Sequence, residues 1–328
     1  MNVVVQASAR LHMGFYNFLS DGVAYGGLGA AIEYPSVVVK VYKHSGDGVK
    51  VFNRSAVEVQ DCVESVVKAL SLNGVSIEIL SAVPRHVGLG STTQTTLAIA
   101  YATSKLLGLN YRVRELAVKL CRGRDSGIGV AAFEVGGFIV DSGRRVGEGG
   151  RVLCPASVSD LPQPVFRAPI PRSWSFAVVI PKKRRGLDEI RERRAMDAPQ
   201  QVSKDVQLEL YKLVFLYMIP ALLRRDIETF GKALTKLQLT VGEYFSKYQG
   251  GVFCCEEAEE AVKAMLKRGA KGVGQSSWGP TVYGLVEGQA TAKRLCRKVL
   301  EEMVARGVEA ECLTVKARNR GADVAVER

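Results

Sequence analysis

Hydrophobic and polar positions in the first half of the chain follow two different periods. Apolar runs, most of them rich in the β-branched residues that suit a sheet, predict strands over residues 3–9, 37–42, 76–83 and 136–141. Apolar residues at every third or fourth position predict helices over residues 56–72, 91–107 and 112–121. Asn73-Gly74 and Gly108 follow the first two of these helices, as expected of residues that end a helix. The first half is therefore expected to mix strands and helices.

Residues 152–172 break this pattern, because prolines are dense there and no periodicity survives. We place the domain boundary in this stretch, with an N-terminal domain over residues 1–165 and a C-terminal domain over residues 166–328. Strands are then expected over residues 173–180, 271–274, 281–286 and 309–315. Helices are expected over residues 202–223, 226–248, 256–268 and 288–306. This order predicts an α+β fold class with a ferredoxin-like second domain.

Length and composition are those of a globular protein: 328 residues suit two domains, and hydrophobic residues make up 47% of the chain. The longest apolar run, residues 213–223, is too short to cross a membrane and contains Pro220, so we expect a buried helix and no membrane association. No basic segment precedes the first strand. We therefore expect no signal peptide and a cytoplasmic location.

The seven cysteines are scattered, and none belongs to a CxxC pair. Adjacent Cys254 and Cys255 cannot both reach one metal in a usual site, so a structural zinc is not expected. In a reducing compartment most of these residues should be buried thiols. A disulfide stays open if the source is a hyperthermophile.

The formal net charge of +12 raises the question of a polyanionic partner. The basic excess is spread along the chain, with one dense stretch, residues 182–194, where acidic residues alternate with basic ones as on a solvated helical face. No RNA-binding aromatic signature accompanies it. The charge therefore favours a polyanionic small substrate over nucleic acid.

A glycine-rich segment, Pro84 to Thr93, lies between a predicted strand and a predicted helix. Gly88 and Gly90 remove side chains where a ligand must approach the backbone, and free N–H groups at a helix N-terminus favour an anion. Neither the GK[ST] ending of a Walker A loop nor the third glycine of a dinucleotide fingerprint is present. The alternative is a plain glycine turn capped by Ser91. The clustering of two glycines and three hydroxyl residues favours a phosphate-binding loop.

Three segments together resemble the GHMP kinase superfamily, in the order found there. Pro84–Thr92 is similar to the PxxxGLGSS loop, residues 124–129 with Gly136-Gly137 are similar to the S-G-[IVL]-D…G-G region, and residues 272–283 are similar to the second glycine-rich stretch. The resemblance implies an N-terminal domain like ribosomal protein S5 domain 2 and a ferredoxin-like C-terminal domain.

The sequence departs from the kinases at their catalytic aspartate. That position is Gly129, which has no side chain to accept a proton. The magnesium-binding glutamate of the kinases would fall near Val118, and Glu115 is the nearest carboxylate, one turn away. The sequence thus retains the phosphate loop but lacks the catalytic aspartate and the magnesium-binding glutamate of the kinases.

One branch of the superfamily, the archaeal β-ribofuranosylaminobenzene 5′-phosphate synthases of methanopterin biosynthesis, resembles the chain more closely. The similar segments are residues 10–12, 86–94, 126–129, 133–134, 136–138 and 274–281. This branch also has glycine at the position of Gly129. The resemblance implies a transferase that joins phosphoribosyl pyrophosphate to 4-aminobenzoate or a related benzoate, releasing pyrophosphate and carbon dioxide. It also implies a homodimer.

That chemistry gives the motif residues expected roles. Candidate catalytic residues are Arg10, His12, Gln94, Asp125 and Glu134. Candidate phosphate-binding residues are Gly88, Leu89, Gly90, Ser91, Thr92, Thr93, Arg122 and Arg124. Candidate substrate-binding residues are His86, Ser126, Gly274, Gln275, Ser276, Ser277, Trp278 and Gly279. Mg²⁺ is the expected cofactor, with Thr92 and Glu134 as candidate ligands.

Two other functions stay open at this point. An ATP-dependent small-molecule kinase would bind ATP at residues 88–93. A basic RNA-binding module on a kinase-like shell would use the net charge and the S5-like fold. The missing aspartate at residue 129 favours the synthase over the kinase.

Overall fold

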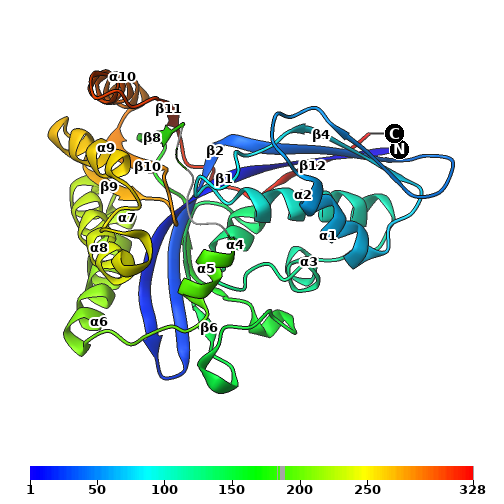
Figure 1. Cartoon of the computed structure of the whole chain (residues 1–328), viewed down its shortest axis with the longest axis horizontal. Helices are drawn as coiled ribbons and strands as arrows, with labels where there is room; N and C mark the ends of the chain where they lie inside the picture. The colour runs from blue at the N-terminus through cyan, green and yellow to red at the C-terminus, as the bar shows by residue number, and fades with distance from the viewer. Residues whose placement is uncertain (183, 185–188, 328) are drawn as a thin grey trace.

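Two sheets with their helices make up the protein, and the computed structural model describes residues 1–182, 184 and 189–327 (Figure 1). Part of the basic stretch at 182–194 therefore lies outside the described residues. The first sheet contains β1 (Asn2–Ser20), β2 (Val23–Lys43), β3 (Val49–Asn53), β4 (Val75–Ser81), β5 (Phe138–Asp141), β6 (Arg144–Arg145), β7 (Pro164–Ala168) and β12 (Asp323–Glu327). Its helices are α1 (Gln60–Leu70), α2 (Ser91–Leu106), α3 (Val113–Lys119) and α4 (Ile128–Glu134).

The second sheet confirms the ferredoxin-like prediction. Its strands are β8 (Trp174–Pro181), β9 (Gly272–Gln275), β10 (Val282–Glu287) and β11 (Ala310–Val315), antiparallel in the order β11-β8-β10-β9. The helices of this half are α5 (Glu189–Met196), α6 (Lys204–Tyr211), α7 (Ile219–Arg224), α8 (Ile227–Gln249), α9 (Glu256–Lys267) and α10 (Gln289–Ala305). Asp226 caps α8, because its side chain accepts a hydrogen bond from Thr229 N.

A long hairpin of β1 and β2 runs across the middle of the molecule, between α1–α4 and α6–α9 (Figure 1). The sequence predicted only its outer ends, at residues 3–9 and 37–42. Residues 11–18 of β1 are all buried, including the polar residues His12 and Asn17, so burial does not alternate along this part of the strand. A strand covered on both faces lacks the period that identifies a half-exposed strand.

Other elements were also missed in the sequence. Strands β3, β7 and β12 and helix α4 lie in segments for which we predicted neither strand nor helix. β7 straddles the predicted boundary at residues 165 and 166, and β12 returns to pair with β1 in the first sheet. The two sheets therefore do not divide the chain at a single position.

The helical run Lys204–Arg224 joins α6, a π-helical segment at Lys212–Met218 and α7. By length and composition alone it could cross a membrane, a test that core helices of soluble proteins also pass. The buried helix predicted for residues 213–223 is confirmed for one face, which includes Leu213 and Met218. Phe215 and Leu216 on the opposite face are exposed.

Asp141, at the end of β5, joins three loops near the hairpin. Its carboxylate accepts hydrogen bonds from the backbone N–H groups of Gly27, Gly127 and Gly143 at 2.9–3.0 Å. The side chain is fully buried, and burial raises its pKa to about 6 in spite of these three donors. The carboxylate therefore holds the start of α4 against β2.

We expect Asp141→Asn to lower the free energy of unfolding by about 1–3 kcal/mol, since the new amide N–H₂ would face the Gly127 N–H and leave it without an acceptor. Urea unfolding at neutral pH measures the change. The exposed substitution Asp47→Asn is the control and should change stability by less than about 0.5 kcal/mol. Equal stability of the two variants would contradict the role given to Asp141.

Candidate active site

A cavity with two connected lobes lies between the hairpin, α2, α5, α8 and the loop after β9. One lobe, of about 200 Å³, is lined by residues 88 and 90–93 of the glycine-rich loop and by His86, Arg193 and Gly279. The other, of about 160 Å³, is lined by aromatic and amide side chains of β1, α8 and the β9 loop. We call them the anion lobe and the aromatic lobe. Both are lined by Arg10, Thr93, Cys121, Arg122, Arg124, Asp125, Glu192, Ser277 and Trp278.

Irregularities in the β1–β2 pairing direct β1 side chains into this cavity. The register shifts between Ser8 and Arg10 and again between His12 and Phe15. β-Bulges bend a strand and redirect its side chains, and they are frequent beside active sites. Gly14, at φ +105° between these positions, leaves room for Leu237, Val241 and Gln238 of α8.

The glycine-rich loop presents its backbone to the anion lobe. Gly88 and Gly90 have φ values of +89° and +80°, which glycine adopts without strain. A Cβ atom on Gly88 would lie 2.1 Å from the Ser276 carbonyl oxygen, so the two glycine-rich motifs touch here. Within the described part of the chain, the N–H groups of residues 88–93 have no protein acceptor. They are available to an anion at the start of α2.

Side chains from both domains fix the loop in this orientation. The Gly88 carbonyl oxygen accepts hydrogen bonds from Arg10 Nη1 at 2.5 Å and from Ser276 Oγ at 2.7 Å. Ser276 Oγ in turn accepts one from His12 N at 3.0 Å. These bonds occupy the Gly88 carbonyl oxygen, whereas the N–H groups of the loop keep no acceptor among the described residues.

Arg10 supplies a buried positive charge where the two lobes meet. Burial lowers its pKa to about 10, an effect that the charge of Glu192 opposes, so the guanidinium stays protonated at neutral pH. Its Nε is buried without a protein partner among the described residues. A desolvated guanidinium with an unused donor is suited to bind a phosphate or carboxylate group.

His12 is neutral, and its hydrogen bonds define its tautomer. Nδ1 accepts a hydrogen bond from Gly14 N at 3.2 Å, so the ring proton lies on Nε2, which donates to Ser126 Oγ at 2.9 Å. Burial, together with the charge of Arg10, lowers the His12 pKa to about 3. Ser126 Oγ also accepts from Ile128 N, which leaves the Ser126 hydroxyl hydrogen for the aromatic lobe.

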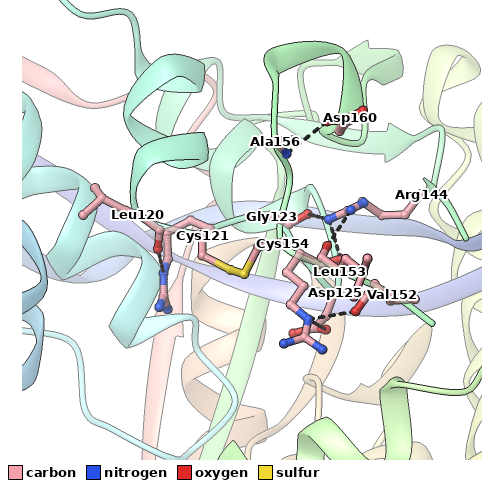
Figure 2. Close-up of a disulfide and its surroundings, with 12 residues drawn as sticks. Leu120, Cys121, Gly123, Asp125, Arg144, Val152, Leu153, Cys154, Ala156 and Asp160 are labelled. Atoms are coloured by element: carbon pink, nitrogen blue, oxygen red, sulfur yellow. Dashed lines mark hydrogen bonds and ion pairs between the residues drawn. A yellow bond between two sulfur atoms is a disulfide. The ribbon is translucent and has the colours of Figure 1, made fainter. Parts of the chain in front are cut away.

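Residues 122–125 form one wall of the cavity, and two cross-links hold them. The first cross-link is the disulfide between Cys121 and Cys154, as Figure 2 shows. The second disulfide of the protein, between Cys296 and Cys312, does not involve this wall. Arg144 donates to the carbonyl oxygens of Arg124 at 3.1 Å and Leu153 at 2.6 Å, joining the same two segments. Our expectation of mostly buried thiols was thus wrong, because four of the seven cysteines are paired across loops that only the folded chain brings together.

Two carboxylates face the shared part of the cavity, Asp125 and Glu192. Burial raises the pKa of Asp125, although the charges of Arg124 and Arg193 oppose the shift. Arg124 lies 3.8 Å from Asp125 and also pairs with Asp197, so its positive charge is partly neutralised. Arg122 donates its Nε to the Leu120 carbonyl oxygen and keeps its remaining donors for the cavity.

The aromatic lobe is walled by Trp278, Phe245 and Phe15. The rings of Phe245 and Trp278 are 4.7 Å apart at 69°, and that of Phe15 is 4.7 Å from His12. Sequence analysis identified Trp278 but missed the α8 residues. Gln238 could have been found, because it lies on the apolar face of the predicted helix 226–248, beside Leu234 and Val241.

Gln94 and Glu134 lie outside the cavity, and Ser91, which lines it, uses its hydroxyl elsewhere. Gln94 is fully buried and donates its amide to the Gly129 carbonyl oxygen at 2.8 Å, which joins α2 to α4. Glu134 forms an ion pair with Arg114 at 2.9 Å and does not line either lobe. Ser91 uses its hydroxyl to cap the Val83 carbonyl at 2.6 Å, so only its backbone can serve an anion.

Leu89, Gly274 and Ser276 also contribute through packing. The Leu89 side chain belongs to the hydrophobic core. Gly274 leaves space for Tyr283 and Gln238. The remaining predicted residues, His12, His86, Arg122, Arg124, Asp125, Ser126, Gln275, Ser277, Trp278 and Gly279, all line the cavity.

Comparisons with known proteins agree with this architecture. The GHMP kinase N-terminal domain family matches residues 57–137, and the GHMP kinase C-terminal family matches residues 218–305. The chain is 31% identical to β-ribofuranosylphenol 5′-phosphate synthase of Archaeoglobus fulgidus, over 98% of this chain and 99% of that one. It is 30% identical to the protein of the same name from Methanocaldococcus jannaschii, over 97% and 99%.

Solved structures show the same fold at low identity. Homoserine kinase from Cytophaga hutchinsonii superposes with a TM-score of 0.72 at 19% identity, covering 99% of this chain and 97% of that one. Mevalonate kinase from L. major, in complex with R-mevalonate, superposes with a TM-score of 0.66 at 15% identity, with 95% of each chain covered. These likenesses extend over both domains.

The pKa of His12 predicts a pH dependence of stability. The folded value of about 3 lies below the unfolded value, so between about pH 6.5 and 3 only the unfolded chain gains this proton. The free energy of unfolding should therefore fall with falling pH, by up to about 1.4 kcal/mol per pH unit from this residue. His12→Gln should lose less stability between pH 7 and 4 in urea titrations. Equal slopes for both proteins would contradict a buried neutral His12.

The disulfide beside the cavity should affect both stability and anion binding. Cys154→Ser opens a loop closed across 33 residues and should lower the free energy of unfolding by roughly 3 kcal/mol. Because residues 122–125 lose one of their two cross-links, pyrophosphate measured by calorimetry should also bind about 5-fold more weakly. Cys312→Ser, which opens the disulfide away from the cavity, should lower stability alone. Equal pyrophosphate affinity in the two variants would contradict this role.

Proposed function

This chain belongs to the GHMP kinase superfamily and, within it, to the β-ribofuranosylphenol 5′-phosphate synthase family, and from this membership we propose that it transfers a phosphoribosyl group to an aromatic ring. The substrates are phosphoribosyl pyrophosphate and a benzoate with a hydroxyl or amino group at C4. The ring carbon that bears the carboxylate bonds to C1 of the ribose as pyrophosphate leaves. The carbon–carboxylate bond then breaks, and its electron pair restores the aromatic ring as carbon dioxide departs.

The observation that carries this proposal is the division of the cavity into two chemically different lobes that meet at Arg10. Backbone N–H groups and arginines suit pyrophosphate, whereas Phe15, Phe245 and Trp278 suit a benzene ring. The ring and the ribose must meet where bond formation occurs. The shared wall provides that place.

The residues of the anion lobe act on the departing pyrophosphate. Negative charge grows on its bridging oxygen as the C1–O bond breaks, and residues 88 and 90–93, whose N–H groups have no acceptor among the described residues, line the lobe. Arg10 adds a cation that burial keeps poorly hydrated. Fixed donors directed at developing charge lower the barrier without reorganisation.

At the position where the kinases have an aspartate that accepts the proton of the substrate hydroxyl, this chain has Gly129. Gly129 faces Thr93, and a Cβ atom there would lie 3.1 Å from Thr93 Cγ2. An aspartate at this position would have to displace that side chain. The proposed synthase reaction forms a carbon–carbon bond and removes no hydroxyl proton at this point, so the glycine suits it better than phosphoryl transfer from ATP.

Mg²⁺ fits the donors at the junction better than it fits Glu134. The carboxylates of Asp125 and Glu192 and the hydroxyl of Thr92 border the lobe that takes the pyrophosphate. Mg²⁺ commonly binds through one or two carboxylates together with substrate phosphates, and when bound it would neutralise pyrophosphate charge. Glu134 is paired with Arg114 outside the cavity. We propose Asp125 and Glu192 as the protein ligands.

Other properties stay predictions. The homodimer and the cytoplasmic location rest on the family resemblance and on the sequence. A negatively charged small-molecule substrate explains the basic residues that line the cavity. These residues are therefore no argument for a nucleic-acid partner.

The proposed reaction can be measured directly. With phosphoribosyl pyrophosphate, Mg²⁺ and 4-hydroxybenzoate labelled in its carboxylate, the protein should release labelled carbon dioxide and pyrophosphate in equal amounts. Arg10→Met should lower kcat/KM by about 100-fold, because it removes the cation that faces the leaving group. Arg297→Met, exposed on α10, is the matched control and should be as active as the wild type.

Two results would contradict the proposal. One is no release of carbon dioxide with either 4-hydroxybenzoate or 4-aminobenzoate. The other is transfer of phosphate from ATP to an alcohol in the presence of Mg²⁺. Pyrophosphate binding measured alongside would show whether an inactive preparation still has a formed anion lobe.

A further inference from the structure

The orientation of the acceptor follows from the reaction and from the cavity, and this inference rests on the proposed function. The new bond forms at the ring carbon that bears the carboxylate, so that carbon must face the ribose at the junction near Arg10. The C4 substituent lies at the opposite end of a rigid ring. It must therefore point away from this junction, into the part of the aromatic lobe that the anion lobe does not share.

Three glutamines, Gln238, Gln249 and Gln275, line the aromatic lobe where that substituent would lie. Two of them are fully engaged. Gln249 Nε2 donates to the carbonyl oxygens of Gly251 and Val252, and its Oε1 accepts from Gln275 Nε2. Gln275 Oε1 accepts from Cys254 N, and its Nε2 also donates to Ser277 O.

Gln238 differs because one end of its amide is unused. Its Oε1 accepts a hydrogen bond from Gln275 N at 2.8 Å, and since a backbone N–H can only donate, this contact fixes which end is oxygen. The Nε2 end lies beside Gly14, another residue of the lobe. Its hydrogens have no acceptor within the residues that the structure describes, although the side chain is only 6% exposed.

The part of the lobe outside the shared wall, which contains Asp125 and Glu192, thus offers unused side-chain donors, whereas its amide oxygens each already accept at least one hydrogen bond. Gln238 Nε2 and the hydroxyl of Ser126 can both donate, whereas the side-chain oxygens of all three glutamines and of Ser126 already accept hydrogen bonds. A phenolic oxygen accepts hydrogen bonds through its lone pairs. An aromatic amine is a poor acceptor, because its lone pair is delocalised into the ring, and its two N–H groups need acceptors.

We propose that Gln238 is a specificity-determining residue, which selects a benzoate with an oxygen at C4 over the corresponding amine. The donor at Nε2 is matched to 4-hydroxybenzoate and mismatched to 4-aminobenzoate. A buried donor left unpaired is costly, so the preference comes as much from rejecting the amine as from binding the phenol.

Equilibrium binding of 4-hydroxybenzoate, 4-aminobenzoate and unsubstituted benzoate, in the presence of Mg²⁺ and pyrophosphate, tests this assignment. The wild-type protein should bind the hydroxy compound about 10-fold more tightly than the amino compound. In Gln238→Glu one carboxylate oxygen can still accept from Gln275 N, while the other replaces the donor with an acceptor. The ratio of the two affinities should fall at least about 10-fold and can reverse.

Gln238→Leu separates loss of the donor from the added charge. It should bring the affinities for the two substituted benzoates to within about 2-fold of each other, with little effect on unsubstituted benzoate. Pyrophosphate affinity reports whether each variant is folded, because the anion lobe does not include Gln238. The kcat/KM ratio for the two acceptors should follow the binding ratio.

The possible outcomes separate this inference from the proposed function. Equal affinities in the wild type, a preference for the amine, or a ratio unchanged in Gln238→Glu would overturn the role of Gln238 while leaving the synthase intact. Pyrophosphate binding without binding of any benzoate would overturn the synthase itself, and the role of Gln238 with it. A preference for the hydroxy compound that Gln238→Glu abolishes supports both.

Discussion

The Gly88 carbonyl oxygen, held by Arg10 and Ser276, is the contact on which the site depends. Its two partners are 78 and 188 residues away in the chain, so this one atom links β1, the glycine-rich loop and the loop after β9. With the carbonyl turned toward these donors, the N–H groups that follow face the anion lobe. A glycine-rich loop alone could adopt several orientations, and the hydrogen bonds from the two domains select the one that can bind an anion.

The same arrangement gives Arg10 two tasks. One of its nitrogens positions the loop, while another buried nitrogen has no hydrogen-bond partner among the described residues. Burying a guanidinium without a carboxylate pair is unfavourable, as its lowered pKa shows. That cost is typical of groups that bind a charged ligand, which supplies the missing partner. The disulfide and Arg144 fix the arginines of the facing wall in a similar way, through contacts outside the cavity.

Under the proposed function, the cavity also accounts for how a kinase fold supports different chemistry. The phosphate loop, its partner loop and both domains are retained, and the solved kinases superpose over nearly the whole chain. What differs is the group beside the phosphates: Gly129 leaves space that Thr93 fills, and an aromatic lobe with neutral amides lies next to the anion lobe. Where the kinase aspartate is absent and an aromatic lobe is present, a different second substrate can bind beside a diphosphate.

The sequence by itself determined the local elements and the chemistry of the motifs. Periodicity located α1 and α8, because one face of each is buried and the other exposed. Short apolar runs located the strands of the second sheet, and residues 84–93 identified the phosphate loop. It could not determine the inner part of the β1–β2 hairpin, where burial on both faces removes the period. The positions of Gln94, Glu134 and Gln238 were also decided by tertiary structure, since the direction of a side chain depends on packing between segments far apart in the chain. A motif determines which groups are available, and only the folded chain determines which of them face the same cavity.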